Sequence, residues 1–113
     1  MRAGDLFWAD LPASAGREQS GRRPVLVLQD DGFGGTLPTV LIIPLTSTLA
    51  ARRFPGSVFI PASKPNGLTL DSVILTFQIR ALDRTRLQSQ LGVIEATILD
   101  QVYSALDRLT GHP

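Results

Sequence analysis

The chain has 113 residues, of which 43% are hydrophobic and 19% are charged, and its formal net charge is +1. We expect a single domain over residues 1–113, because this length and hydrophobic content support one packed core and exclude a disordered chain. The near-zero charge excludes a strong general attraction to nucleic acid, and the absence of cysteine excludes disulfides and thiolate metal sites. No stretch approaches the roughly 20 apolar residues of a membrane-spanning helix and the first residues form no signal peptide, so we expect a cytoplasmic protein.

The first half of the chain predicts three strands separated by polar loops. Residues 4–11 place apolar side chains on one side and end at Pro12, which cannot donate to a sheet ladder. Residues 24–29 (PVLVLQ) form a continuous apolar run, which is typical of a strand buried on both faces. Residues 39–45 (TVLIIPL) predict another buried strand, in which Pro44 indicates a sheet edge or a bulge.

The second half predicts shorter strands. Residues 46–54 have the composition of a loop, and residues 56–60 (GSVFI) predict a short strand. Residues 72–79 (SVILTFQI) form the longest strand candidate, and residues 87–91 predict a further short strand after the charged segment 80–86. The chain therefore carries five or six short strands with turn signals between them.

The last segment, residues 95–109, predicts a helix that ends at Gly111. Its apolar residues fall on one stripe at helical spacing, namely Ile98, Leu99, Val102, Leu106 and Leu109. Because the strands do not alternate with helices, a parallel α/β sheet is excluded. We expect a mainly β protein, a curled and mostly antiparallel sheet or small barrel with one C-terminal helix.

Few kinds of catalytic chemistry are open to this chain. The only histidine, His112, lies one residue from the C-terminus, which argues against a histidine base, a serine triad or a zinc site. The remaining candidates are a carboxylate at Glu18, a guanidinium at Arg23, and hydroxyls at Thr46 and Ser47. This set suits metal-free cleavage of RNA, in which the neighbouring 2′-hydroxyl is the nucleophile and cations stabilise charge at phosphorus.

The stretch GREQSGRRP at residues 16–24 carries two of these groups and has two interpretations. It could be a glycine-hinged loop, anchored by the buried strand that follows, that holds a base and a cation over a phosphate. It could also be a solvated charged loop without a catalytic role. Spacing alone favours the second interpretation.

Four segments together resemble the MazF/PemK family of toxins, which are ribosome-independent mRNA interferases: GDLFWADLP, GREQSGRRPVLVL, PLTSTL and DSVILTFQIRALDRTRL. The resemblance runs from residue 4 through the terminal helix. It implies a small SH3-like barrel of the plasmid-maintenance-toxin type, and a homodimer with single-stranded RNA bound across or near its interface. It also implies a cognate antitoxin with a disordered inhibitory segment, no cofactor, and products with 2′,3′-cyclic phosphate and 5′-hydroxyl ends.

The same resemblance implies roles for individual residues. Arg23 matches the catalytic arginine of the family, and Thr46 matches the threonine that works beside it. Glu18 matches a glutamate that some members use as an acid–base residue. Gln19 and Gln78 match positions that line the same site, so all five residues are expected to converge.

The chain departs from the family at Phe77, where members usually carry an acid before the glutamine of the Q-I-R motif. If the chain is active, Glu18 must then be the base, while Phe77 could stack on an RNA base or fill the core. Arg52 and Arg53 fit either a pair that contacts RNA phosphates or a solvated surface pair. Ser47 is a further candidate hydrogen-bond donor to RNA.

Two other functions remain open from the sequence. A protein-binding toxin of the gyrase-poison type would share the fold and lack nuclease activity, and a structural SH3-like adaptor would have neither property. Retention of the E-Q, R-P and L-T residues favours the ribonuclease, because a pure binding protein does not need that set. Incubation of RNA with the protein in EDTA separates these functions.

Overall fold

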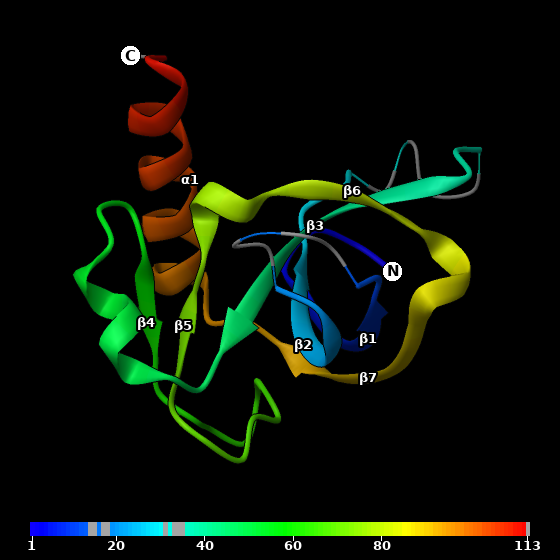
Figure 1. The fold of residues 1–113 in the computed structure, drawn as a ribbon, viewed down its shortest axis with the longest axis horizontal. Coiled ribbons are helices and arrows are strands. Elements are labelled where there is room, and N and C mark those ends of the chain that lie inside the picture. The colour runs from blue at the N-terminus through cyan, green and yellow to red at the C-terminus, as the bar shows by residue number, and fades with distance from the viewer. Residues whose placement is uncertain (14–15, 17–18, 31, 33–35, 113) are drawn as a thin grey trace.

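The computed structural model describes residues 1–13, 16, 19–30, 32 and 36–112 (Figure 1). In this described part, seven strands form one curled sheet in the order β4-β5-β3-β2-β1-β7, with β6 paired to β3. Every pairing is antiparallel. The strands are β1 (Asp5–Leu11), β2 (Gly21–Val27), β3 (Thr39–Thr46), β4 (Val58–Ile60), β5 (Ser72–Ile74), β6 (Arg80–Asp83) and β7 (Leu87–Val93).

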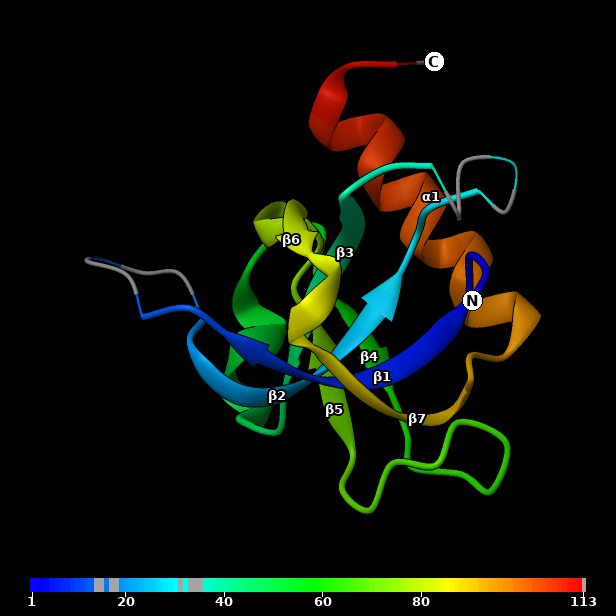
Figure 2. The same cartoon turned by 90° about the vertical axis from the view of Figure 1, so that its right-hand side faces the viewer.

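One C-terminal helix, α1 (Ala96–Thr110), follows the strands and packs against β4. It stands to one side of the sheet in Figure 1, whereas β1, β2 and β7 lie side by side on the other half in Figure 2. The helix ends at Gly111, whose φ of 73° is the left-handed conformation that glycine adopts without strain. The predicted mainly β fold with a C-terminal helix is therefore confirmed, including the helix stop.

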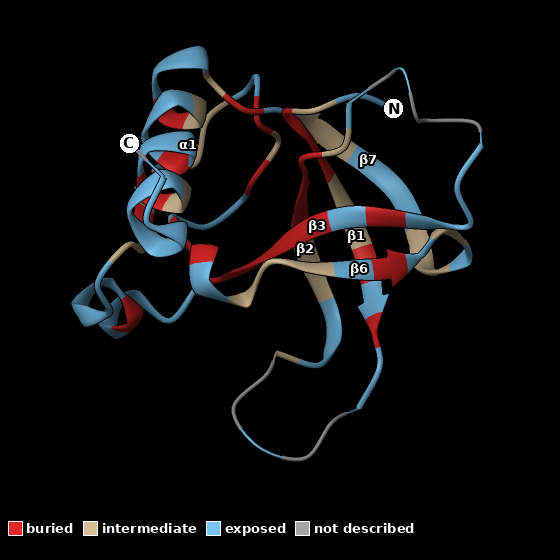
Figure 3. Ribbon diagram, turned by 90° about the horizontal axis from the view of Figure 1, so that it is seen from above, coloured by how far each residue is buried: buried red, intermediate tan, exposed pale blue. Residues whose placement is uncertain are grey.

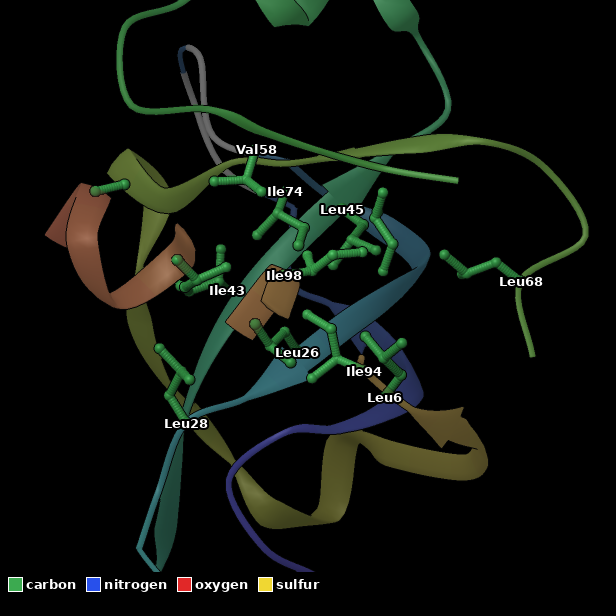
Figure 4. Packing of buried hydrophobic residues seen from close by; sticks show 13 residues of the cluster. Leu6, Leu26, Leu28, Ile43, Leu45, Val58, Leu68, Ile74, Ile94 and Ile98 are labelled. Carbon is green, nitrogen blue, oxygen red and sulfur yellow. The ribbon is translucent and has the colours of Figure 1, made fainter. Parts of the chain in front are cut away.

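Strand β2 is buried on both of its faces, as its apolar run predicts. Val25 and Val27 point into one hydrophobic cluster, and Leu26 points into the other, because successive strand residues face opposite sides. All three are 0% exposed. The larger cluster, shown in Figure 4, also takes Ile98 from α1, and Figure 3 shows the buried residues concentrated in the strands and on the inner face of α1. The second half of β2, directly after Arg23 and Pro24, is thus anchored by two cores.

Strand β3 changes partner along its length, and Pro44 stands at the change. Residues 39–42 pair with β6, and residues 45–46 pair with β5. The carbonyl of Pro44 accepts from the backbone N–H of Leu75 at 3.0 Å. The prediction of a sheet edge at Pro44 is wrong, because β3 lies inside the sheet. Its missing N–H is tolerated because it faces the break between two partner strands.

The long strand predicted over residues 72–79 is also wrong, because β5 ends at Ile74. The chain turns there into a short 3₁₀-helix, η3 (Thr76–Gln78), and the buried Thr76 hydroxyl donates to the carbonyl of Gly56. A second strand, β6, then begins at Arg80. The predicted loop 46–54 likewise contains a 3₁₀-helix, η2 (Leu49–Arg53). The turn η2 thus follows the end of β3, and η3 separates β5 from β6.

The loop at residues 61–71 is held against β7 by close backbone contact. Gly67 has a φ of +72°, and a Cβ at this position would collide with the carbonyl oxygen of Leu91. A Cβ at Gly92 would collide with the carbonyl oxygen of Pro65, which also accepts from the backbone N–H of Val93 at 2.8 Å. Glycine is required at both positions because the two backbones approach so closely.

A polar network fastens the same loop to the start of α1. Glu95 occupies the N-cap position without capping the helix. Its carboxylate instead accepts from Ser63 Oγ at 2.8 Å and from Asn66 Nδ2 at 3.1 Å. Asn66 is fully buried, and its Oδ1 accepts from the backbone N–H groups of Ser63 and Leu68 at 3.1 and 3.0 Å.

Among the described residues, none of the helices combines the length and apolar character needed to cross a membrane.

Candidate active site

A surface cavity of about 370 Å³ lies where β2 begins, β3 ends, and η2 and η3 face each other. Six of the residues predicted from the sequence line it: Gln19, Arg23, Thr46, Arg53, Phe77 and Gln78. Phe54 lines it as well, and no sequence motif indicated that residue. We call this space the aromatic cavity, after Phe54 and Phe77. It draws on three separate segments of the chain, residues 19–23, 46–54 and 75–78, so only the fold brings these side chains together.

A second cavity of about 300 Å³ lies beside it and is called the loop cavity. Its strand side includes Arg22 and Ser47, and its opposite side is formed by residues 67–70 of the docked loop. Arg23 and Thr46 line both cavities. These two side chains therefore lie where the cavities adjoin, which is the convergence of guanidinium and hydroxyl that the sequence predicted.

Arg23 is half-buried near the start of β2, opposite Ala9 of β1. Its Nε donates to the carbonyl of Ser20 at 2.9 Å, which orients the guanidinium plane. A guanidinium keeps its charge at any physiological pH, so Arg23 brings a fixed positive charge to both cavities. The neighbouring Arg22 lies over the ring of Trp8, with 4.1 Å between its Cζ and the ring centroid.

Thr46 is the last residue of β3 and is 6% exposed. Its Oγ1 accepts a hydrogen bond from the backbone N–H of Thr48 at 3.2 Å. Because the hydroxyl accepts in that bond, its own proton can still be donated to a ligand. The bond fixes the oxygen at the strand end, next to the charge of Arg23.

The segment before β2 is tied to η3 and β6 through Gln19. Its backbone N–H donates to Oε1 of Gln78 at 2.9 Å, and its carbonyl accepts from Arg80 at 2.7 Å. These bonds place both glutamines on the aromatic cavity. Among the described residues, the buried Oε1 of Gln19 has no hydrogen-bond partner.

The aromatic wall consists of Phe54 and Phe77, whose ring centroids are 5.3 Å apart at an interplanar angle of 60°. Each is 37% exposed, so the alternative that Phe77 fills the core is wrong. Arg53 lies over Phe54, with 4.8 Å between its Cζ and the ring centroid. Arg52 instead lies over Phe59 at 4.4 Å and lines neither cavity. The two adjacent arginines therefore face different surroundings.

The predicted base, Glu18, lies outside the described residues. Among the described residues that line either cavity, none carries a carboxylate or an imidazole. Ser47 is exposed and lines the loop cavity rather than the aromatic cavity. The described part of the site thus consists of fixed positive charge, a hydroxyl, two amides and an aromatic wall, which can bind and stabilise a phosphate flanked by a planar group.

Comparison with known proteins finds relatives over nearly the whole chain. The protein-family model described as PemK-like, MazF-like toxin of type II toxin–antitoxin system matches residues 2–110 of this chain. The chain is 39% identical to the endoribonuclease MazF of Staphylococcus saprophyticus, over 95% of this chain and 88% of that protein. It is 38% identical to the endoribonuclease EndoA of Bacillus subtilis, over 94% of this chain and 90% of that protein.

Solved structures show the same fold. The crystal structure of MazF from Deinococcus radiodurans has a TM-score of 0.83 and 35% identity, covering 98% of this chain and 96% of that one. A MazE–MazF structure from the same organism has a TM-score of 0.78 and 35% identity, covering 100% of this chain and 97% of that one.

Proposed function

Because the chain belongs to the PemK-like, MazF-like toxin family of type II toxin–antitoxin systems, we propose that it is an endoribonuclease toxin that cleaves single-stranded RNA. The observation that carries this proposal is the shared position of Arg23 and Thr46, which line both cavities from adjacent strands. Relatives that are 36% to 39% identical are named endoribonucleases, which supports the same enzyme class here. The surrounding domain, residues 1–113, is a single toxin domain in this proposal.

The reaction proceeds by attack of a ribose 2′-hydroxyl on the adjacent phosphorus. The bond from phosphorus to the 5′-oxygen of the next nucleotide breaks, and that oxygen takes a proton from water, which gives a 2′,3′-cyclic phosphate and a 5′-hydroxyl end. Arg23 stabilises the extra negative charge on the pentacoordinate phosphorus, and the Thr46 hydroxyl donates to a non-bridging oxygen. Glu18 accepts the 2′-proton, since the position before Gln78 holds Phe77 instead of an acid. No metal takes part in these steps.

Three arginines on the cavity rims, Arg22, Arg23 and Arg53, supply local attraction for the RNA backbone. This local charge is compatible with a net charge of only +1 for the whole chain. The attraction is electrostatic, so binding weakens as the salt concentration rises.

The proposal includes partners for the toxin. A MazE–MazF complex is among the similar structures, which supports an antitoxin that binds this chain through a disordered segment and blocks the cavities. The active form is a homodimer in the cytoplasm, with RNA bound across or near the interface of the two copies.

The test is incubation of the purified chain with a single-stranded RNA in EDTA, with the products analysed by mass spectrometry. We expect cleavage that ends in cyclic phosphates, and Arg23→Ala should lower kcat by about 10²- to 10³-fold, the usual loss when one oxyanion-stabilising donor is removed. Arg108→Ala, on the exposed face of α1, is the matched control and should cleave normally. Intact RNA after incubation with the folded wild-type chain would refute the proposal and favour a protein-binding toxin.

A further inference from the structure

The aromatic cavity contains more apolar surface than a phosphate needs. Phe54 and Phe77 form one wall, and Leu75 and Ala51 also line the space. A phosphate oxygen gains nothing from such a surface, because anions favour water or hydrogen-bond donors over apolar contact. The phosphate-binding groups, Arg23 and Thr46, lie where this cavity adjoins the loop cavity. The rest of the aromatic cavity is therefore shaped for the part of the ligand that is attached to the phosphate.

The wall is held in place as a stacking surface. Phe54 packs against Phe77 at 60°, and Arg53 lies over Phe54, so the first ring is fixed from two directions. Phe77 belongs to η3, which Thr76 fastens through its bond to Gly56. Its ring is still 37% exposed on the cavity. A ring that is fixed and exposed at the same time is suited to stack on a planar ligand.

Gln19, which lines the cavity, carries an unsatisfied acceptor. Oε1 of Gln19 is buried and has no hydrogen-bond partner among the described residues. The backbone bonds of Gln19 to Gln78 and Arg80 fix the position from which this side chain extends. A buried acceptor is costly unless a ligand donates to it. Every RNA base offers a donor on its exposed edge, either an exocyclic amine, in adenine, cytosine and guanine, or a ring N–H, in guanine and uracil.

Resting on the proposed function, we propose that the aromatic cavity binds one unstacked RNA base adjoining the cleaved phosphate. The base stacks on Phe77, and the donor on its exposed edge bonds to Oε1 of Gln19. Phe77, at the position where the family usually carries an acid, thereby becomes a binding residue for the base. Because each of the four bases has a ring face and a donor on that edge, this contact adds affinity without selecting one base.

The experiment is a double-mutant cycle between the protein and the RNA. An oligonucleotide that the wild-type chain cleaves is resynthesised with an abasic ribonucleotide at one position at a time. At the nucleotide held in the aromatic cavity, the abasic change should lower kcat/KM of the wild-type chain by about 5- to 150-fold, the range expected for loss of one base–aromatic stack. Phe77→Leu should lower kcat/KM on the intact RNA by a similar factor. In this variant the abasic change should cause no further fall in kcat/KM.

Two further variants test the stacking face and the fold. Phe77→Tyr keeps the ring and should restore sensitivity to the abasic position. Tyr103→Leu removes an exposed aromatic ring of α1 that lines neither cavity, and it should behave as wild type. Gln19→Leu should lower kcat/KM on the intact RNA, and this loss should disappear with the RNA that is abasic at the coupled position.

The outcomes separate this inference from the proposed function. If Phe77→Leu cleaves RNA with the same kcat/KM as the wild-type chain, the base-binding cavity is refuted and the ribonuclease stands. The same conclusion follows if the abasic change lowers kcat/KM of Phe77→Leu and of the wild-type chain by the same factor at every position. An equal loss for Gln19→Leu on the intact and the abasic RNA refutes the role of Gln19. A folded wild-type chain that cleaves no RNA refutes both proposals together.

Discussion

The two sides of the loop cavity are held in place by different forces. On the strand side, Arg23 and Thr46 lie next to Val25 and Leu45, which are 0% exposed and belong to the hydrophobic cores. On the opposite side, the loop 61–71 depends on close backbone contact and on the buried side chain of Asn66. The groups assigned to catalysis thus share the rigidity of the core, whereas the facing wall rests on a few specific contacts. A single substitution should therefore disturb one side without the other.

The largest effect is expected from Gly67→Ala. The new Cβ would meet the carbonyl of Leu91, and alanine would also have to adopt a φ of +72°. We expect the free energy of unfolding to fall by at least ~3 kcal/mol, because backbone strain and overpacking act together. Urea denaturation followed by circular dichroism measures this loss.

Gly111→Ala is the matched control for Gly67→Ala. Gly111 has nearly the same φ of +73°, but its Cβ would meet nothing within 4 Å. Only the conformational strain remains, which costs about 1 to 2 kcal/mol. Equal losses for the two variants would show that the contact with Leu91 does not hold the loop.

The next effect, from Asn66→Ala, tests the polar part of the same wall. The substitution removes the acceptor of two backbone N–H groups and one donor to Glu95. Because these partners lie in a buried network, we expect a loss of about 2 to 3 kcal/mol in urea denaturation. Asp71→Ala removes a comparable but exposed bond to the backbone of Ala62 and should cost less than ~1 kcal/mol. A larger loss for Asp71→Ala would contradict this account.

These contacts mark the limit of what the sequence predicts about the fold. The apolar runs that became β2 and β3 were predictable, because burial on both faces requires continuous hydrophobicity. The end of β5 at Ile74 was not, since it depends on the Pro44 carbonyl and the Gly56 carbonyl, which are distant in sequence. Strand β6 was missed for a similar reason, because its charged sequence becomes a strand only by pairing with β3.

The candidate site follows the same division. Arg23 and Thr46 were predicted because they sit at the ends of recognisable strands and within family motifs. Phe54 was missed, since its place beside Phe77 is set by two short 3₁₀-helices that no periodic pattern announces. The separation of Arg52 from Arg53 was also hidden, because η2 turns adjacent side chains in different directions.

On the strand side, Thr46→Val should reduce activity while the fold is retained. Valine has nearly the shape of threonine but lacks its hydroxyl, and Thr46 lines both cavities. We expect kcat to fall about 10- to 150-fold, in proportion to the loss of one hydrogen bond to a charged oxygen, ~1.5 to 3 kcal/mol, in the transition state. Thr46→Ser keeps the hydroxyl and should retain most activity. Equal rates for valine and threonine would remove Thr46 from the mechanism.

The smallest effect is expected at Asp83, which lies on β6 and lines neither cavity. The Thr85 hydroxyl, followed by the Thr85 backbone N–H, donates to its carboxylate and lowers the pKa of Asp83. A lowered pKa in the folded state means that the carboxylate stabilises the fold above the usual aspartate pKa of about 3.9, and that this stabilisation is lost as the pH falls through the folded value. The Asp83→Asn variant should therefore have a slightly lower free energy of unfolding than wild type at pH 7, and the two free energies should become equal in acid.

Thr85→Val should raise the pKa of Asp83, measured by NMR titration of its carboxyl carbon. It should leave RNA cleavage unchanged, because Asp83 and Thr85 line neither cavity.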